Sequence, residues 1–319
     1  MKHNFIDPIQ VLFYDKIAFT FPIRKSKRLL LIDRLNDPNF YEKYNRRVYG
    51  HNNGRYQNNY QFEIFQWNTI KLSVYPINTS HNFLRVEYNP RNLGVRGRKK
   101  FRLFLIKLLT KDVMKKIYFH ARLTRLDLTL DVFDMEPGLY IHRSRIEQSE
   151  IYRDKFGYKI ISQVIGSEMS NRRITMYDKR AEQGIEDSIA LDFDFYPSFE
   201  NISHHRIEIR LRNLDCTMAE LDRHLLKEFK AINFYKDSFL EDEGFSKEFR
   251  DDAYENGLNS ALYILVDQER RRYLKLLENY RIKPLSFKKR DMDFDAAHKE
   301  GLRSLVHREY EQQFLAQVA

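Results

Sequence analysis

The stretch LTRLDLTLDVF, residues 123–133, decides the fold class. Leucine alternates along it with charged or polar residues, and this two-residue period is typical of a strand with one buried face. The buried face would carry Leu126, Leu128 and Leu130. The opposite face would carry Arg125, Asp127, Thr129 and Asp131. The sequence therefore predicts a strand that is apolar on one side and charged on the other.

A basic residue, an aliphatic residue and an acid recur in this order on three predicted strands. The copies are Arg85-Val86-Glu87, Arg125-Leu126-Asp127 and Arg206-Ile207-Glu208, and the last continues through Arg210 and Arg212. Residues two apart share one face of a strand. They either form cross-strand ion pairs with neighbouring strands on a solvated face, or gather carboxylates around Mg²⁺ or Mn²⁺ with arginines nearby for phosphates. The pattern alone leaves both interpretations open.

Strand and helix periods also appear on either side of this stretch. Further strands are expected over residues 13–22, 61–67, 70–75, 83–88, 158–166 and 172–178, with a turn at 167–171. Helices are expected over 25–35 and 99–119, and the asparagine-rich 46–59 is expected to be a loop or loose hairpin.

Beyond residue 214 the pattern becomes helical. The capping box Thr217-x-x-Glu220 opens one predicted helix, and apolar spacing predicts two more over 258–280 and 291–317. We therefore expect a sheet-containing catalytic domain over 1–214 and a helical part over 215–319.

The charge balance indicates the kind of partner. Among 319 residues, 55 Lys and Arg face 45 Asp and Glu, which gives a net charge of +10. A basic protein attracts polyanions, and nucleic acid is the commonest polyanion in a cell. The single Cys216 excludes an internal disulfide, and no apolar run is long enough for a membrane span. The composition predicts a cytoplasmic protein that binds nucleic acid and no membrane.

One tyrosine lies where a predicted strand gives way to a predicted helix, in RRITMYDKRAEQG, residues 172–184. Tyr177 would share the polar face of the strand with Arg173, while the apolar residues lie on the other face. Forming a phenolate at pH 7 costs about 4 kcal/mol, which Arg173, Lys179 or Arg180 would reduce. Tyr177 is therefore a candidate nucleophile, with ordinary packing as the alternative for any one of 20 tyrosines.

Other catalytic motifs are missing from the sequence. There is no GxxxxGK[ST] loop for ATP, and no His-aliphatic-His triplet of the kind that relaxases use to hold a metal. His204 and His205 are adjacent and would point to opposite faces of a strand. The tyrosine is therefore the best candidate for chemistry.

Four segments, in order, resemble the Rep_trans family of rolling-circle plasmid replication initiators. They are LRVEYNPRNL (84–93), LTRLDLTLDVFD (123–134), RRITMYDKRAEQ (172–183) and HRIEIRLRN (205–213). The resemblance implies an α+β fold, mainly an antiparallel sheet with flanking helices, similar to a relaxase nicking domain without its His pair. Separately from the resemblance, two basic clusters at 270–272 and 288–290, on either side of Pro284, are either a solvated face or a surface on which the helical C-terminal part docks duplex DNA.

The resemblance further implies a site-specific nicking and strand-transfer enzyme. The family cuts one strand of a double-stranded origin within an extruded single-stranded hairpin loop. A tyrosine becomes joined to the 5′ phosphate, and the 3′ hydroxyl is left as a primer. The family uses Mg²⁺ or Mn²⁺, acts as a homodimer and recruits a host helicase in the bacterial cytoplasm.

The resemblance assigns roles by position. Tyr177 is the expected nucleophile, with Lys179 and Arg173 beside it. The carboxylates expected at the metal are Asp127, Glu208, Asp131 and Glu87, of which the first two are preferred. Positive charge, and not the resemblance, gives the expected DNA contacts, which are Arg125, Arg180, Arg206, Arg210, Arg271, Lys288, Lys289 and Arg290. Asp178 stands beside the nucleophile where we expect a neutral residue.

Two other functions fit the same residues. The chain could be a basic nucleic-acid-binding protein without catalysis, in which Tyr177 packs and the acids pair with arginines. It could also be a carboxylate-metal nuclease in which water, and not tyrosine, attacks the phosphate.

Overall fold

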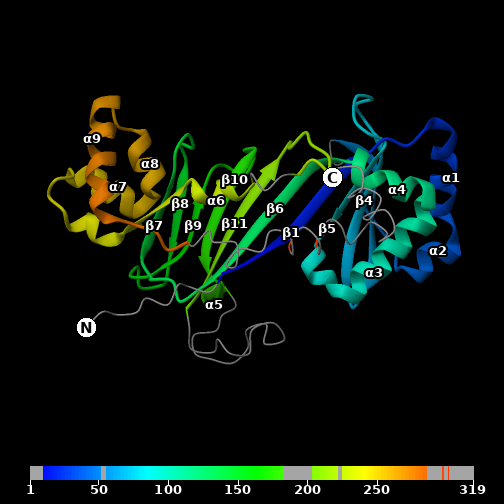
Figure 1. Ribbon diagram of the computed structural model, residues 1–319, viewed down its shortest axis with the longest axis horizontal. Coiled ribbons are helices and arrows are strands. Elements are labelled where there is room, and N and C mark those ends of the chain that lie inside the picture. The colour runs from blue at the N-terminus through cyan, green and yellow to red at the C-terminus, as the bar shows by residue number, and fades with distance from the viewer. Residues whose placement is uncertain are drawn as a thin grey trace, which may run out of the picture. The chain divides into compact units, whose positions relative to one another are not determined.

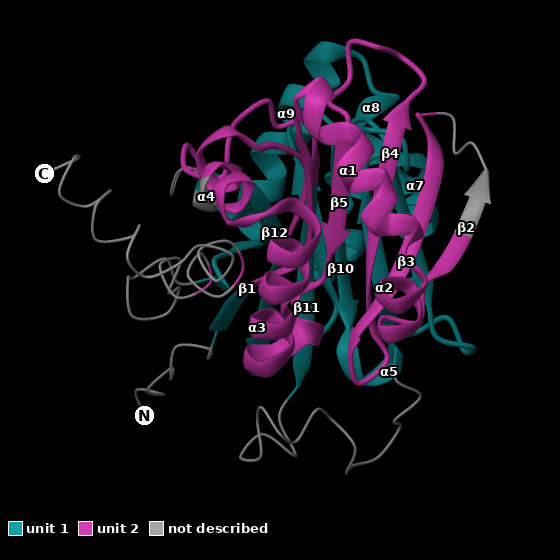
Figure 2. Cartoon of the chain, turned by 90° about the vertical axis from the view of Figure 1, so that its right-hand side faces the viewer, with its two compact units in different colours: residues 1–12, 129–210, 223–293 teal, residues 13–128, 211–222, 294–319 magenta. Residues whose placement is uncertain are grey.

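The protein has an α+β fold, with mainly antiparallel strands and flanking helices, as the sequence predicts (Figure 1). The computed structural model describes residues 10–51, 55–182, 203–221, 225–285, 297 and 301. The chain divides into two compact units, and it passes between them within three strands (Figure 2). Unit 1 comprises residues 1–12, 129–210 and 223–293, and unit 2 comprises residues 13–128, 211–222 and 294–319.

Unit 2 is built on strands in the order β2-β3-β4-β5-β1-β6, with residues 122–128 of the last strand. The strands are β1 (Gln10–Phe21), β2 (Arg47–His51), β3 (Tyr56–Phe65), β4 (Asn68–Pro76), β5 (Leu84–Tyr88) and β6 (Arg122–Phe133). The helices are α1 (Lys25–Asn36), α2 (Pro38–Lys43), α3 (Pro90–Leu109) and α4 (Lys111–His120). Helix α3 buries an aromatic and leucine face, and Phe104 contacts the ring of Phe62 on β3.

One detail of unit 2 differs from the expectation. The single helix predicted over 99–119 is two helices, because Thr110 between α3 and α4 has φ 79°, a conformation that a β-branched residue rarely adopts. The apolar spacing continues across this break, so periodicity does not reveal it. In the predicted loop or loose hairpin over 46–59, the described residues of β2 and β3 pair antiparallel, as in a hairpin.

Unit 1 holds strands in the order β6-β11-β10-β9-β8, with residues 129–133 of β6 and 204–210 of β11. The new strands are β8 (Ser149–Arg153), β9 (Ile160–Ile165), β10 (Arg172–Asp178) and β11 (His204–Arg212). A smaller sheet has the order β13-β12-β7, from Arg281–Ile282, Ile232–Lys236 and Leu139–Arg143. The helices are α5 (Lys179–Glu182), α6 (Leu226–Lys230), α7 (Lys247–Asn256), α8 (Leu258–Tyr263) and α9 (Asp267–Leu277). Short 3₁₀ helices follow β12 at Asp237–Glu241 and α9 at Glu278–Tyr280.

The last three helices and the small sheet share an aromatic core. Tyr140, Tyr235, Phe239, Phe245 and Tyr273 are buried together in it. The part of the chain beyond residue 214 is therefore not purely helical, because β12 and β13 pair with β7 from earlier in the sequence. Strands of two and five residues are too short to show a period in the sequence.

The predicted helix over 258–280 is also divided. Helix α8 ends at Tyr263 and α9 begins at Asp267. The guanidinium of Arg270 donates to the carbonyls of Leu262, Tyr263 and Leu265, which closes the end of α8.

The capping box at Thr217 and Glu220 forms both of its hydrogen bonds, but residues 218–220 make a turn and α6 begins at Leu226. The helix predicted over 291–317 lies outside the described residues apart from positions 297 and 301. The boundary at residue 214 stays a prediction about separable domains. Among the described helices, none is long and apolar enough to cross a membrane.

Candidate functional site

Tyr177 lies on the polar face of β10, as the sequence predicts. Tyr177 and Arg173 are half-buried on this face, whereas Ile174 and Met176 are buried on the other. On β9, Ser162 is the register partner of Tyr177. Since strand residues alternate between faces, a hydrophobic core on one side leaves the tyrosine on the more open side.

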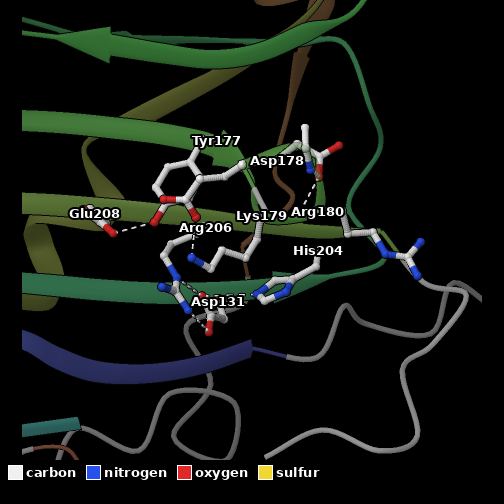
Figure 3. A network of polar contacts seen from close by, with 10 residues as sticks. Asp131, Tyr177, Asp178, Lys179, Arg180, His204, Arg206 and Glu208 are labelled. Carbon is white, nitrogen blue, oxygen red and sulfur yellow. Dashed lines mark hydrogen bonds and ion pairs between the residues drawn. The ribbon is translucent and has the colours of Figure 1, made fainter. Parts of the chain in front are cut away.

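The phenol of Tyr177 points to a carboxylate on the neighbouring strand. Its hydroxyl donates to Oε1 of Glu208 on β11 at 2.7 Å. Figure 3 shows the ring directed toward Glu208 and Arg206. On β11, Ile207 and Ile209 are buried, so residues 206, 208 and 210 form the polar face that adjoins Tyr177. A candidate nucleophile and a candidate proton acceptor are therefore in direct contact.

The pKa of the Tyr177 phenol is raised well above its ordinary value. Burial is the largest cause, the negative charge of Glu208 adds to it, and the positive charge of Arg206 opposes it. The positive charge that lowers this pKa comes from Arg206, and an effect of Arg173, Lys179 or Arg180 stays a prediction. Lys179 lies with Nζ 5.6 Å from the centre of the tyrosine ring and also pairs with Glu182. The phenol keeps its proton and offers it to Glu208.

Behind the tyrosine, Arg206 is fixed by a fully buried acid. Its Nε and Nη2 donate to the two oxygens of Asp131 on β6 at 2.6 and 3.0 Å. His204 Nε2 lies 3.3 Å from the same carboxylate, and its ring stacks on Phe133. Burial works against ionisation, but the hydrogen bonds from His204 and Arg206 hold the pKa of Asp131 well below its ordinary value.

Asp131 therefore orients the guanidinium of Arg206 and keeps it charged. Burial alone would lower the pKa of Arg206, but the hydrogen bond and the charge of Asp131 raise it, and Tyr177 adds to this effect. The sequence predicted a DNA contact at Arg206 and a metal ligand at Asp131, with cross-strand ion pairs as the alternative, but it did not show which acid pairs with which arginine. They are 75 residues apart in the chain, so only the fold brings them together.

Asp178 does not lie beside the phenol. Its side chain is buried on the opposite face, where Oδ2 binds Nζ of Lys159 at 2.5 Å. Its other oxygen accepts from the backbone N–H groups of Arg180 and Ala181 at the start of α5. Burial disfavours the charge, but these contacts leave the pKa of Asp178 lowered. The negative residue next to Tyr177 in sequence is thus accounted for as a helix cap and ion-pair partner.

His204 and His205 point to opposite faces, as predicted. His204 approaches Asp131, while His205 is close enough to Asp178 for their charges to interact. Burial is the main cause of the lowered pKa of His205.

The other two predicted ligands belong to unit 2 and are paired within their own strands. Arg85 Nη2 binds Oε2 of Glu87 at 2.6 Å. Arg125 Nε and Nη2 bind the two oxygens of Asp127 at 2.8 and 2.5 Å. Within residues 10–51, 55–182, 203–221 and 225–285, no three His, Cys, Asp or Glu side chains are grouped so as to hold a metal ion.

The donor set of the described residues does not fit a preformed metal site. Asp131 and Asp127 each have both oxygens bound by a guanidinium, and Glu208 accepts from Tyr177. A requirement for Mg²⁺ or Mn²⁺ stays a prediction.

The remaining predicted residues lie in several places. Arg173 and Arg210 share the sheet face of Tyr177, and the charge of Arg173 acts on Tyr152. Arg180 is the second residue of α5, and Arg271 is exposed on α9. Lys288, Lys289 and Arg290 lie outside the described residues.

Comparisons with known proteins give a similarity to a solved structure. No family model and no curated protein matches the chain. Among solved structures, the chain is similar to the rolling circle replication initiator protein from Geobacillus stearothermophilus, at 15% sequence identity and a TM-score of 0.37. The match covers 70% of this chain and 79% of that chain. A likeness at this level does not define an activity.

Proposed function

We propose that the protein is a DNA nicking and strand-transfer enzyme in which Tyr177 is the nucleophile. The observation that carries the proposal is the 2.7 Å hydrogen bond from the Tyr177 phenol to Glu208, on the polar face of a sheet. Arg206 adds a fixed positive charge beside the phenol. The net charge of +10 suits a polyanionic substrate.

The proposed step is the attack of the phenol oxygen on a DNA phosphorus. As the tyrosine O–P bond forms, the P–O3′ bond breaks, and the phenol proton passes to Glu208. Glu208 then returns the proton to the leaving 3′ oxygen, so the carboxylate ends as it began. The products are a 5′-phosphotyrosine link and a free 3′ hydroxyl. Because one phosphoester bond forms for each one that breaks, the strands can be rejoined without ATP.

The positive side chains around the phenol would stabilise the charge that develops on the phosphate. Arg206 is held in place by Asp131, so it needs no reorganisation when the substrate arrives. Lys179 lies at the ring and carries a second charge. We also infer that proton transfer to Glu208 accompanies the attack, because the raised pKa of Tyr177 disfavours a phenolate formed beforehand.

We place this activity at the start of rolling-circle replication, on the strength of the sequence resemblance. The substrate would be a double-stranded origin with a single-stranded hairpin loop. Mg²⁺ or Mn²⁺, a homodimeric state and a host helicase belong to the same proposal. The helical part with Arg271, Lys288, Lys289 and Arg290 would contact the duplex.

A denaturing gel tests the proposal. The protein is incubated with a random pool of single-stranded oligonucleotides that carry a 3′ label, with Mn²⁺ or with EDTA. A labelled band at the size of the protein, with DNA on the Tyr177 peptide by mass spectrometry, is expected. Cleavage without this band would support the nuclease that uses water, and DNA binding without cleavage would support the binding protein.

A further inference from the structure

The hairpin between β8 and β9 exposes three aromatic side chains in unit 1. Tyr158 is 89% exposed, Phe156 is 68% exposed and Tyr152 is 52% exposed. Large rings of this kind are normally buried in part, and neighbouring exposed rings mark interaction surfaces. These three residues are not used by the proposed chemistry at Tyr177.

The hairpin is held firmly, although its rings are exposed. Oδ1 of Asp154 accepts from the backbone N–H groups of Tyr158 and Lys159 at 2.9 and 3.2 Å. The backbone carbonyl of Asp154 accepts from Gly157, which has φ 79°. The loop therefore has a defined shape before any ligand binds, which lowers the entropic cost of binding.

Helix α7 supports the hairpin from the side. The hydroxyl of Tyr254 donates to the carbonyl of Gly157 at 2.8 Å. The guanidinium of Arg153 lies 3.7 Å from the centre of the Tyr254 ring and donates to the carbonyl of Tyr254 and to the hydroxyl of Tyr140. These contacts fix the base of the hairpin and leave Phe156 and Tyr158 facing solvent.

The hairpin is also basic. Between Arg153 and Lys159 the chain has three basic residues and one acid, and the acid is Asp154, whose carboxylate is bound to the loop backbone. Nζ of Lys155 lies 5.0 Å from the centre of the Phe156 ring. Alternation of aromatic rings and positive charge is the combination that binds single-stranded nucleic acid, because rings stack on bases and cations contact phosphates.

Strand register connects this hairpin to Tyr177. Ser162 of β9 is the partner of Tyr152 on one side and of Tyr177 on the other. Directly opposed residues point to the same face, so Tyr152 and Tyr177 share one face of the sheet, two strands or about 10 Å apart. In Figure 1 the strands β8, β9 and β10 lie next to one another. Lys159 reinforces the link by pairing with Asp178, the residue after Tyr177.

We propose that Tyr152, Phe156 and Tyr158, with Lys155, form a surface on which the bases of single-stranded DNA stack beside Tyr177. The proximity to Tyr177 makes this surface part of the proposed nicking function, although binding itself needs no catalysis. Stacking accepts any base, so the surface would hold the strand without reading its sequence.

Fluorescence anisotropy with a labelled oligothymidine tests the surface, in full-length protein that carries Tyr177→Phe so that no strand is cut. Tyr158→Ala and Phe156→Ala should each weaken binding by about five- to fifty-fold, and Tyr158→Trp should restore it. The matched control is Trp67→Ala, because Trp67 is 83% exposed in the turn between β3 and β4 and should leave binding unchanged.

Two readouts separate stacking from charge. With an oligonucleotide of abasic sites, which keeps the phosphates, the Tyr158→Ala variant and its parent should bind alike. Lys155→Gln removes one phosphate contact, so the slope of log affinity against log salt concentration should become shallower by about 0.7. Tyr158→Ala should leave this slope unchanged.

The proposal is overturned if both alanine variants bind oligothymidine as their parent does, or if they lose affinity equally for the abasic strand. A change in oligomeric state with unaltered DNA binding would also overturn it and would identify a surface for self-association. The nicking gel is independent of these measurements. Protein that binds through the hairpin but forms no covalent band would retain this surface and refute the nicking function.

Discussion

The same three-residue pattern is used differently in the two units of the molecule. In unit 2, Arg85 pairs with Glu87, and Arg125 pairs with Asp127, each within its own strand. In unit 1, Arg206 binds Asp131 on β6, while Glu208 accepts the phenol of Tyr177 on β10. The first arrangement pairs each acid with an arginine of its own strand, whereas the second joins side chains of three strands.

The difference shows what makes a charged face reactive. In Asp127 both carboxylate oxygens are bound by an arginine of the same strand, so this acid is already engaged in an ion pair. In unit 1, both oxygens of Asp131 bind Arg206 on the neighbouring strand. Glu208 is then the acid that accepts the hydrogen bond from the Tyr177 hydroxyl. Both units contain the three-residue pattern. Unit 1 differs because Asp131 and Tyr177 lie beside Arg206 and Glu208.

The largest expected effect is that of Tyr177→Phe. Removing the hydroxyl should abolish the covalent protein–DNA band, by at least about 10³-fold in rate, because no other atom takes the place of the nucleophile. DNA binding measured by anisotropy should change little. If the phenylalanine variant still nicks, Tyr177 is not the nucleophile, and the contact between Tyr177 and Glu208 does not make unit 1 the reactive unit.

Glu208→Gln and Glu87→Gln form the next comparison. Glutamine at 208 can accept the phenol hydrogen bond but cannot take the proton, so nicking should fall by roughly 10²- to 10⁴-fold. Glutamine at 87 should change nicking by about twofold or less. Single-turnover rates on an oligonucleotide that the protein cuts would measure both.

Calorimetry with Mn²⁺ distinguishes a base from a metal ligand at the two preferred ligand positions, Glu208 and Asp127. If Glu208 acts as a base, the affinity for Mn²⁺ should be the same in wild type and in Glu208→Gln. A lower affinity in Glu208→Gln or in Asp127→Asn would restore the original assignment of these acids as ligands.

The third comparison concerns stability. Asp131→Asn leaves Arg206 buried without its counter-charge and should lower the free energy of unfolding by about 3 kcal/mol. Asp127→Asn should cost about 1 kcal/mol, because Arg125 is nearer to solvent. Urea unfolding of the two variants measures the difference, and equal losses would mean that the two pairs are equivalent.

The pH dependence gives the smallest expected effect. The pKa of Asp131 is lower in the folded protein than in the unfolded chain, so its contribution is complete above the ordinary Asp value of about 4 and is lost as pH falls below it. The pKa of Glu87 is lowered as well, with burial opposing and Arg85 favouring the charge. Between pH 7 and pH 3, Asp131→Asn should therefore lose less stability than wild type, and Glu87→Gln should show a smaller change of the same sign.

The sequence by itself determined the faces of the strands. Alternation placed Tyr177 opposite Ile174 and Met176, and it placed residues 206 and 208 opposite Ile207 and Ile209. These predictions are confirmed because a period of two residues is a local property of the backbone, and burial of one face follows directly. The α+β class follows from the same alternation combined with the helical spacing of α1 and α3.

Tertiary structure alone decided which partner each charged side chain has. A strand face with several arginines and acids allows many ion pairs, and the choice depends on strand order and register. Strand order brought Asp131 to Arg206 and Tyr177 to Glu208, and it directed Asp178 to Lys159. The small sheet of β7, β12 and β13 also depends on pairing between distant segments, whereas the breaks at Thr110 and between α8 and α9 interrupt an apolar spacing that continues across them. Their apolar residues look the same in sequence with or without the break, so local periodicity carries no signal for them.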